Sequence, residues 1–144
     1  MLTVTLLVAL LVSPAWSTDQ FFTVSLRLLK PIVMTEVHAL SFPDANTGVG
    51  QDLVVHASST DAGAFEVVGS KNIGISSSVV ENSIMITSPD TDTAITVDGF
   101  TLSSPHVIND QGKATVKVGG TAHILADAKE GDYSGTATLR VVYL

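Results

Sequence analysis

The stretch that decides the fold is the end of the chain, Val118 to Leu144, which reads VGGTAHILADAKEGDYSGTATLRVVYL. Between Tyr133 and Tyr143 the residues alternate between two faces, one largely apolar and one with Ser134, Thr136, Thr138 and Arg140. A period of two is typical of a half-buried β-strand. We therefore expect a closing strand that directs Leu139, Val141 and Tyr143 into a core.

The residues before this strand continue the same pattern. Ala114, Val116 and Val118 alternate with polar residues, and Ala122, Ile124 and Ala126 form the next inward row. The pair Gly119-Gly120 between the two rows predicts a bulge or a sharp bend in the ladder.

The middle of the chain is a series of short strand-like pieces separated by turn formers, with no apolar stripe of helical period. We expect strands at Leu53–Ala57, Ala64–Val68, Ile73–Val80, Ser83–Thr87, Ala94–Val97 and Phe100–Leu102, with turns that include Asp98-Gly99. Ile32–Val37 and Ala39–Phe42 predict a further strand pair or one bent strand. Such a pattern favours an all-β sandwich or barrel.

The start of the chain has the features of a signal peptide, predicted at residues 1–17. An apolar core from Val4 to Val12 precedes Ala15-Trp16-Ser17, with small residues at the first and third positions as at a cleavage site, although no Lys or Arg comes before the core. The core is shorter than the roughly 20 residues that span a bilayer, and a buried N-terminal strand or helix is the alternative. Cleavage leaves residues 18–30 as an extension and residues 31–144 as one β-sandwich domain, with no membrane span.

The extension alternates as well. Phe22, Val24, Leu26 and Leu28 share one face, while Thr23, Ser25 and Arg27 share the other, and Pro31 then interrupts the pattern. The pattern predicts a strand, and the sequence leaves open whether this strand pairs within its own chain or in a neighbour.

Several of these residues resemble bacterial families. The run Val118-Gly119-Gly120-Thr121, the run Gly131-Asp132-Tyr133-Ser134-Gly135-Thr136 and the closing strand resemble a family of secreted domains of unknown function, as does Leu40-Ser41-Phe42, although Pro43 stands where many relatives have Gly. The ending is also similar to the C-terminal motif of chaperone-usher pilins, with Gly131 and Tyr143 at the motif's glycine and penultimate aromatic.

The pilin resemblance implies a fold, a partner and a location. The fold would be an immunoglobulin-like, pilin-like β-sandwich of short antiparallel strands, and the protein would be secreted through the periplasm to the bacterial surface or a fimbrium. Copies would assemble head to tail as a homo-oligomer. The strand that a periplasmic chaperone recognises would be marked by Gly131, Tyr133, Leu139, Val141 and Tyr143. Many pilins have a disulfide, whereas this chain has no cysteine.

Composition argues against several other classes. The chain has 14 acidic and 7 basic residues, so nucleic acid is a poor partner. His38, His56, His106 and His123 lack the spacing of a metal site, and we expect no metal or cofactor. Asp90, Asp92 and Asp98 do not complete a calcium loop. The residues around Ser134 do not form a nucleophile elbow, so we expect no enzyme activity.

Two function classes remain. In the first, the protein is a structural subunit of a surface filament and donates Phe22, Val24, Leu26 and Leu28 as a strand to a neighbour's sheet. In the second, it is a secreted monomeric module for surface binding or adhesion, which uses loops such as Asp44–Gly48 or Ser88–Thr93.

Overall fold

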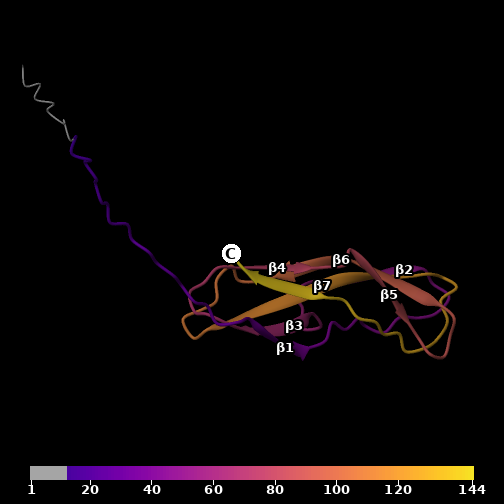
Figure 1. Ribbon diagram of the computed structural model, residues 1–144. Helices are drawn as coiled ribbons and strands as arrows, with labels where there is room; N and C mark the ends of the chain where they lie inside the picture. Colours follow the sequence, from indigo (N-terminus) through magenta and orange to yellow (C-terminus); the bar gives the residue numbers. More distant parts are fainter. Residues whose placement is uncertain (1–12) are drawn as a thin grey trace, which may run out of the picture.

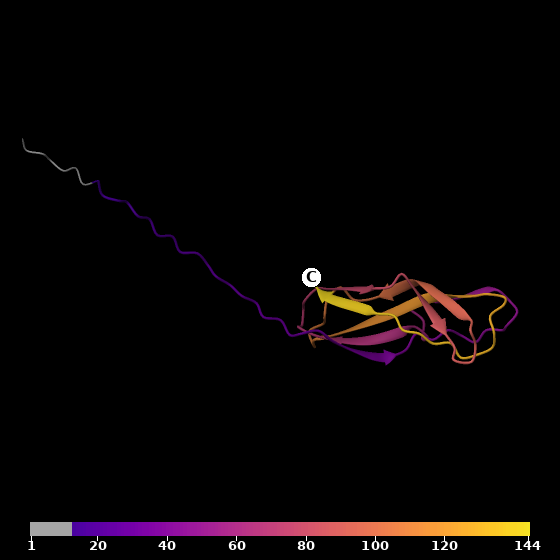
Figure 2. The same cartoon turned by 45° about the vertical axis from the view of Figure 1, so that its right-hand side comes forward.

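The computed structural model describes residues 13–144, so the apolar core predicted for the signal peptide lies outside the described residues. Residues 13–32 form neither helix nor strand, and the part before Lys30 leads away from the body as an extended chain (Figures 1 and 2). In the part of the chain that is described, every regular element is a strand: β1 (Val33–His38), β2 (Gln51–Val55), β3 (Gly63–Val68), β4 (Ile75–Val79), β5 (Ser83–Thr87), β6 (Ala94–Ser103), β7 (Lys113–Ile124) and β8 (Leu139–Tyr143).

The strands form two sheets of unequal size, and all named pairs are antiparallel. The six-stranded sheet has the order β1-β3-β7-β6-β5, with β2 also paired to β7, and the second sheet contains only β4 and β8. This arrangement confirms the predicted all-β, sandwich-like fold. Among residues 13–144 there is no helix with the length and apolar character needed to cross a membrane.

The long strand β7 organises the large sheet because two strands share one of its edges. β3 pairs with residues 113–118 and β2 with residues 120–124. At Gly119, between them, a Cβ atom would overlap the backbone of Val55 and Ala57. Only glycine therefore lets β2 come this close.

The predicted irregularity at Gly119-Gly120 lies in the partner strand. Gly99 and Phe100 of β6 both oppose Gly120, where the register of the β6–β7 pair shifts. The turn predicted at Asp98-Gly99 is therefore wrong, because these residues belong to a bulge inside one continuous β6, with Gly99 at a φ of 56°.

The core consists of two clusters that differ in how well they are covered. In the first, between the two sheets, side chains such as Val67, Ile108 and Val116 are fully buried. The second contains Ile95, Val97 and Ala122, and the larger side chains that pack on it are only partly buried. The two-stranded sheet therefore completes one half of the sandwich and leaves the other half thinly covered.

The closing strand is shorter than its alternation predicts, and the N-terminal stretch forms no strand in the single chain. The closing strand begins only at Leu139, and Ser134 forms an isolated bridge with Thr87 in place of a strand start. Residues 22–28, predicted as a strand, pair with no strand of the body, and their pairing in a neighbouring copy stays a prediction. A strand requires a partner edge for its backbone groups as well as an alternating sequence.

Candidate functional site

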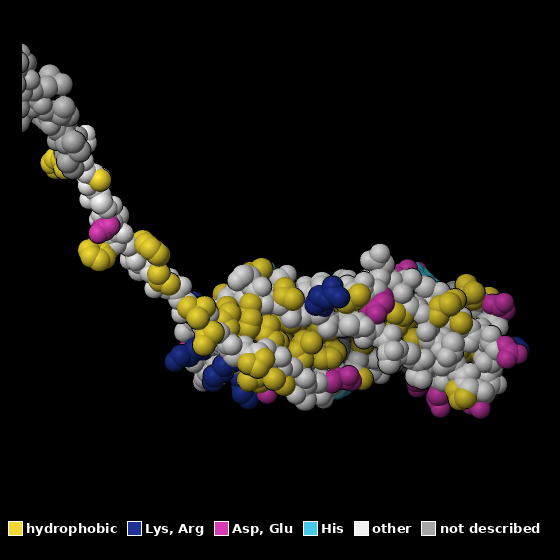
Figure 3. Space-filling model, in the orientation of Figure 1, with side chains coloured by type: hydrophobic (Ala, Val, Ile, Leu, Met, Phe, Trp, Pro, Cys, Tyr) yellow, Lys and Arg dark blue, Asp and Glu magenta, His cyan; other side chains and the backbone are white. Residues whose placement is uncertain are grey.

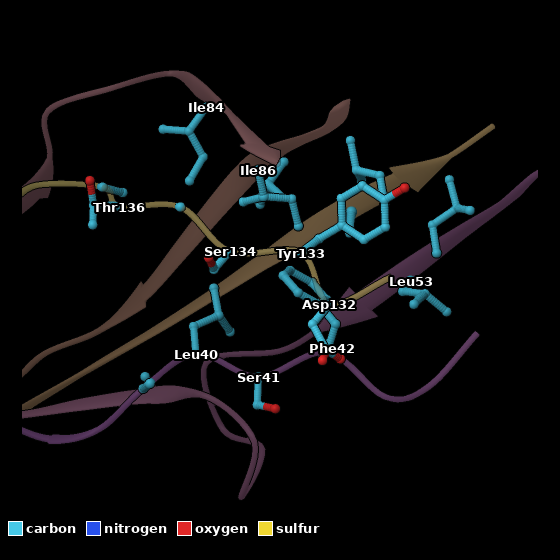
Figure 4. Close-up of a pocket in the computed structure, with 18 of the residues that line it drawn as sticks. Leu40, Ser41, Phe42, Leu53, Ile84, Ile86, Asp132, Tyr133, Ser134 and Thr136 are labelled. Carbon is cyan, nitrogen blue, oxygen red and sulfur yellow. The ribbon is translucent and has the colours of Figure 1, made fainter. Parts of the chain in front are cut away.

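An open groove with a volume of about 830 Å³ lies over the second core cluster. Its floor comes from the large sheet, and its two walls are residues 39–47 and residues 128–139. In Figure 4, Leu40 and Phe42 point across the groove toward Ser134 and Tyr133, while Ile84 reaches in from β5. We call this feature the open groove.

The open groove exists because the second sheet is too narrow to cover the large one. β4 and β8 lie over the first cluster, and over the second only irregular chain closes the sandwich. As a result, large apolar side chains in the groove stay partly exposed to solvent: Phe42, Leu53, Ile84, Ile86, Phe100 and Tyr133. Apolar surface in a concave site is typical of a place that receives a ligand or a chain segment.

Among the strands with an unpaired edge, β1 and β8 reach the open groove with one end only, and β8 then runs over the first cluster. β1 pairs only with β3, and β8 pairs only with β4. The start of β1 and the end of β8 lie close together, because the Tyr143 hydroxyl contacts Lys30, three residues before β1. The end of β1 and the start of β8 both reach the open groove, so β1 runs toward the groove and β8 runs away from it.

The exposure of β1 indicates that its inner face lacks a cover. Met34 and Glu36 lie opposite Val67 and Phe65 of β3, so they share the core-facing side of the sheet. Nevertheless all six residues of β1 are exposed, although Val67 beside them is fully buried. An additional strand between β1 and β8 would cover this face.

The four residues predicted for donation are all highly exposed. The exposed fractions are 83% for Phe22, 80% for Val24, 84% for Leu26 and 85% for Leu28. In Figure 3 this apolar segment projects from the body. The segment and the open groove are therefore separate in the single chain.

A small hydrogen-bond network fixes the place where the segment leaves the body. The Tyr143 hydroxyl donates to the Lys30 carbonyl at 2.7 Å and accepts from the Ser70 N–H at 2.7 Å. The Lys30 N–H donates to the Ser70 Oγ, also at 2.7 Å. We call these three bonds the Lys30 latch. The penultimate aromatic, singled out for its resemblance to pilins, thus contacts the base of the N-terminal segment.

The other residues predicted for the C-terminal strand divide between the two halves of the molecule. Val141 is buried in the first cluster, and Leu139 packs against it. Gly131 and Tyr133 lie in the groove wall, where a Cβ on Gly131 would overlap the Ser88 hydroxyl. The Tyr133 hydroxyl donates to the Lys129 carbonyl at 2.8 Å, which fixes its ring along the wall.

The beginning of β8 is held by a carboxylate. Glu81 accepts hydrogen bonds from the Thr138 N–H at 2.7 Å and from its hydroxyl at 2.8 Å. These bonds, with the backbone N–H contributing most, lower the pKa of Glu81. The groove wall is therefore fixed at its junction with β8.

One polar cluster was not predicted from the sequence. His123 of β7 lies between Asp52 of β2 and Asp98 of β6, with each ring nitrogen 2.7 Å from a carboxylate oxygen. The hydrogen bond to Asp98, followed by that to Asp52, raises the pKa of His123. The cluster thus joins three strands of the large sheet.

The loops predicted for a binding module border one end of the open groove. Residues 44–47 line the groove, and the Thr91 hydroxyl lies 3.3 Å from that of Tyr133. Within residues 13–144, no three His, Cys, Asp or Glu side chains are grouped so that they could hold a metal ion.

The comparisons with known proteins give one family. A family model described as "Domain of unknown function (DUF4402)" matches residues 36–143. Neither the curated proteins nor the solved structures gave a match. The residues that resemble a family of secreted domains, 40–42 and 131–136, form the two facing walls of the open groove, whereas the likeness to pilins stays a prediction. Because the matched region covers most of the chain, this protein belongs to the DUF4402 family, a family of domains of unknown function.

Proposed function

We propose that the protein is a structural subunit of a bacterial surface filament, in which residues 18–30 of one copy fill the open groove of the next copy. One observation supports this most strongly: a single chain presents an uncovered apolar groove and, separately, an unpaired apolar segment. The groove lacks a chain segment that covers its apolar side chains, and the segment lacks an apolar surface and a strand edge to pair with.

The energetics favour such an exchange. Burying a large apolar side chain is worth roughly 1.5 to 3 kcal/mol, so Phe22, Val24, Leu26 and Leu28 together offer roughly 6 to 12 kcal/mol before the cost of ordering the segment. The unpaired edges of β1 and β8 supply main-chain hydrogen-bonding groups as well. In strand addition, main-chain bonds give affinity and alternate side chains in pockets give specificity.

The Lys30 latch favours donation over self-filling. To enter its own groove, the segment would have to reverse its direction immediately before β1, at Lys30 and Pro31. Both backbone polar groups of Lys30 are already bonded, to Ser70 and Tyr143, in the conformation that leads the segment outward. Donation to another copy keeps these bonds. Repetition of such a head-to-tail contact gives an open filament.

Secretion and a chaperone complete the proposal. An uncovered apolar groove with free strand edges is an aggregation hazard. A periplasmic chaperone that covers the open groove and the β8 edge would protect the subunit until it reaches the cell surface or fimbrium. Tyr143→Ala should then lower the periplasmic level of the protein by more than its loss of stability alone would cause. Val142→Ala, on the exposed face of β8, is the control.

The test removes the segment and returns it as a peptide. Deleting residues 18–29 removes no strand from the body. We expect the chain that begins at Thr18 to form a heat-sensitive ladder on a denaturing gel, and the deleted chain to remain monomeric and bind the excised peptide.

A chain beginning at Thr18 that stays monomeric at high concentration, in the absence of any chaperone, would refute the assembly. If this monomer binds a glycan or host surface through residues 44–48 and 88–93, the protein is instead a secreted binding module.

A further inference from the structure

The two ends of the body carry charge of opposite sign. Figure 3 shows Lys and Arg side chains at the end from which the segment leaves, and Asp and Glu side chains at the opposite end. We call these ends the basic pole and the acidic pole. The difference is notable because the chain as a whole has an excess of acidic residues, 14 against 7 basic ones.

The basic pole is built around the Lys30 latch. Lys71 follows Ser70, and Arg27 precedes Lys30 by three residues. Lys113 lies at the same pole, where the Gly69 N–H bonds to the Gly112 carbonyl, but it is paired with Glu66 at 3.1 Å. Asp110 in the adjoining loop offsets a further part of the charge. Within the described residues, Arg27, Lys30 and Lys71 form no salt bridge.

The acidic pole surrounds the far end of the open groove. Three loops meet there, because Gly131 lies against Ser88 and Thr91, and Gly50 lies against Ala126. Their carboxylates are exposed and form no salt bridge in the part of the chain that the structure describes: Asp44, Asp90, Asp92, Asp127, Glu130 and Asp132. Lys129 is the basic side chain among them.

Strand direction connects these poles to assembly. β8 ends at the basic pole, where Tyr143 contacts Lys30, and begins beside the groove. A donated segment antiparallel to β8 would leave the groove at the acidic pole, so that the donor's basic pole meets the acceptor's acidic pole. A segment parallel to β8 would leave at the acceptor's basic pole, and two like-charged surfaces would meet.

We propose that the basic pole of one copy docks on the acidic pole of the next, and that this charge complementarity selects the donated strand's antiparallel direction. The inference rests on the proposed function and adds a second interface outside the groove. Complementary charges of this kind raise association rates by about 10-fold to 1000-fold and suppress the wrong orientation. The effect falls as salt shortens the range of the charges, to about 10 Å at 0.1 M.

The test reverses the charge of side chains at each pole alone and then at both poles together. Asp127→Lys with Glu130→Lys reverses part of the acidic pole, and Lys30→Glu with Lys71→Glu reverses part of the basic pole. We expect each variant to assemble at least about 10-fold more slowly at low salt, and the chain with all four substitutions to recover the native rate. The two single-pole variants shift net charge in opposite directions, and the four-substitution chain keeps the native charge, so net charge cannot explain this result.

A peptide separates failure of this inference from failure of the proposed function. The peptide spans residues 18–28 with Arg27→Gln and an amidated C-terminus, so the end that leaves the groove at the acidic pole carries no charge and the peptide reports the groove alone. It should bind the deleted chain equally well with or without the acidic-pole substitutions. If it binds but the single-pole variants assemble at the native rate, or the four-substitution chain is not rescued, the charge inference is wrong. If the peptide binds neither the chain that lacks residues 18–29 nor its acidic-pole variant, the proposed function itself fails.

Discussion

Leu26 allows a quantitative test of strand donation, because it contributes little to the monomer and much to the proposed contact. Its side chain is 84% exposed, so Leu26→Ala should change the monomer's free energy of unfolding by less than about 0.5 kcal/mol. In the groove the same substitution removes three buried carbon atoms, at about 0.8 kcal/mol each. The loss of about 2.4 kcal/mol corresponds to roughly 50-fold weaker binding.

The charged variant sharpens this test, because the alternation supplies a matched control. Leu26→Asp would place a carboxylate in an apolar groove, and desolvating that charge costs several kcal/mol beyond the lost burial. Ser25→Asp adds the same charge one residue earlier, on the face that points away from the groove. We expect Ser25→Asp to change the affinity by about twofold or less.

Fluorescence anisotropy of labelled peptides spanning residues 18–30, titrated with the chain that lacks residues 18–29, measures these affinities. The expected order is native and Ser25→Asp, then Leu26→Ala, then Leu26→Asp. Equal weakening by Ser25→Asp and Leu26→Asp would show that charge alone matters. Unchanged binding by all the variants would refute burial of the face that carries Leu26.

Three further predictions concern the body of the molecule. Tyr143→Phe removes the hydroxyl of the Lys30 latch and leaves the Ser70 N–H unpaired, so the free energy of unfolding should fall by about 1 to 3 kcal/mol in urea titrations; no change would contradict the latch. Gly119→Ala should lower the melting temperature strongly, whereas Gly50→Ala, whose added Cβ meets nothing closer than 3.7 Å, should not; equal effects would argue against close packing of β2 on β7. Because the folded pKa of His123 is raised above 6.5, the stability advantage over His123→Gln should be full below pH 6.5 and disappear as the pH rises through the folded pKa. An advantage that does not change between about pH 6 and pH 9 would contradict this pairing.

The local pattern of the sequence was enough to predict the fold class and several strands. The limits predicted for the strand Ser83–Thr87 agree with β5, because alternating apolar residues there lie between clear turn formers. Alternation alone does not make a strand in the single chain, as at Phe22 to Leu28, where no partner edge is present. The prediction was wrong at Asp98-Gly99, where a turn signal produced a bulge in a continuous strand.

The features of the site could not be predicted because they depend on contacts between distant parts of the chain. Asp52 meets His123 through the pairing of β2 with β7, across 71 residues of sequence. The open groove results from a second sheet of only two strands, and no local pattern indicates how many strands will cover a face. Leu40 to Phe42 and Gly131 to Thr136 resemble a family in sequence, but that resemblance does not indicate that the two stretches face each other.

Photo-crosslinking from Phe22 tests most directly whether the segment of one copy fills the groove of another. Benzoylphenylalanine in place of Phe22 keeps an aromatic side chain at the position, and mixing this chain with an isotope-labelled native chain distinguishes links between copies from links within one. Mass spectrometry of the irradiated assembly should find links between copies, at residues 39–47 or 128–139 of the labelled chain. Links confined to the probe's own chain, or links to surfaces outside the open groove, would contradict strand donation.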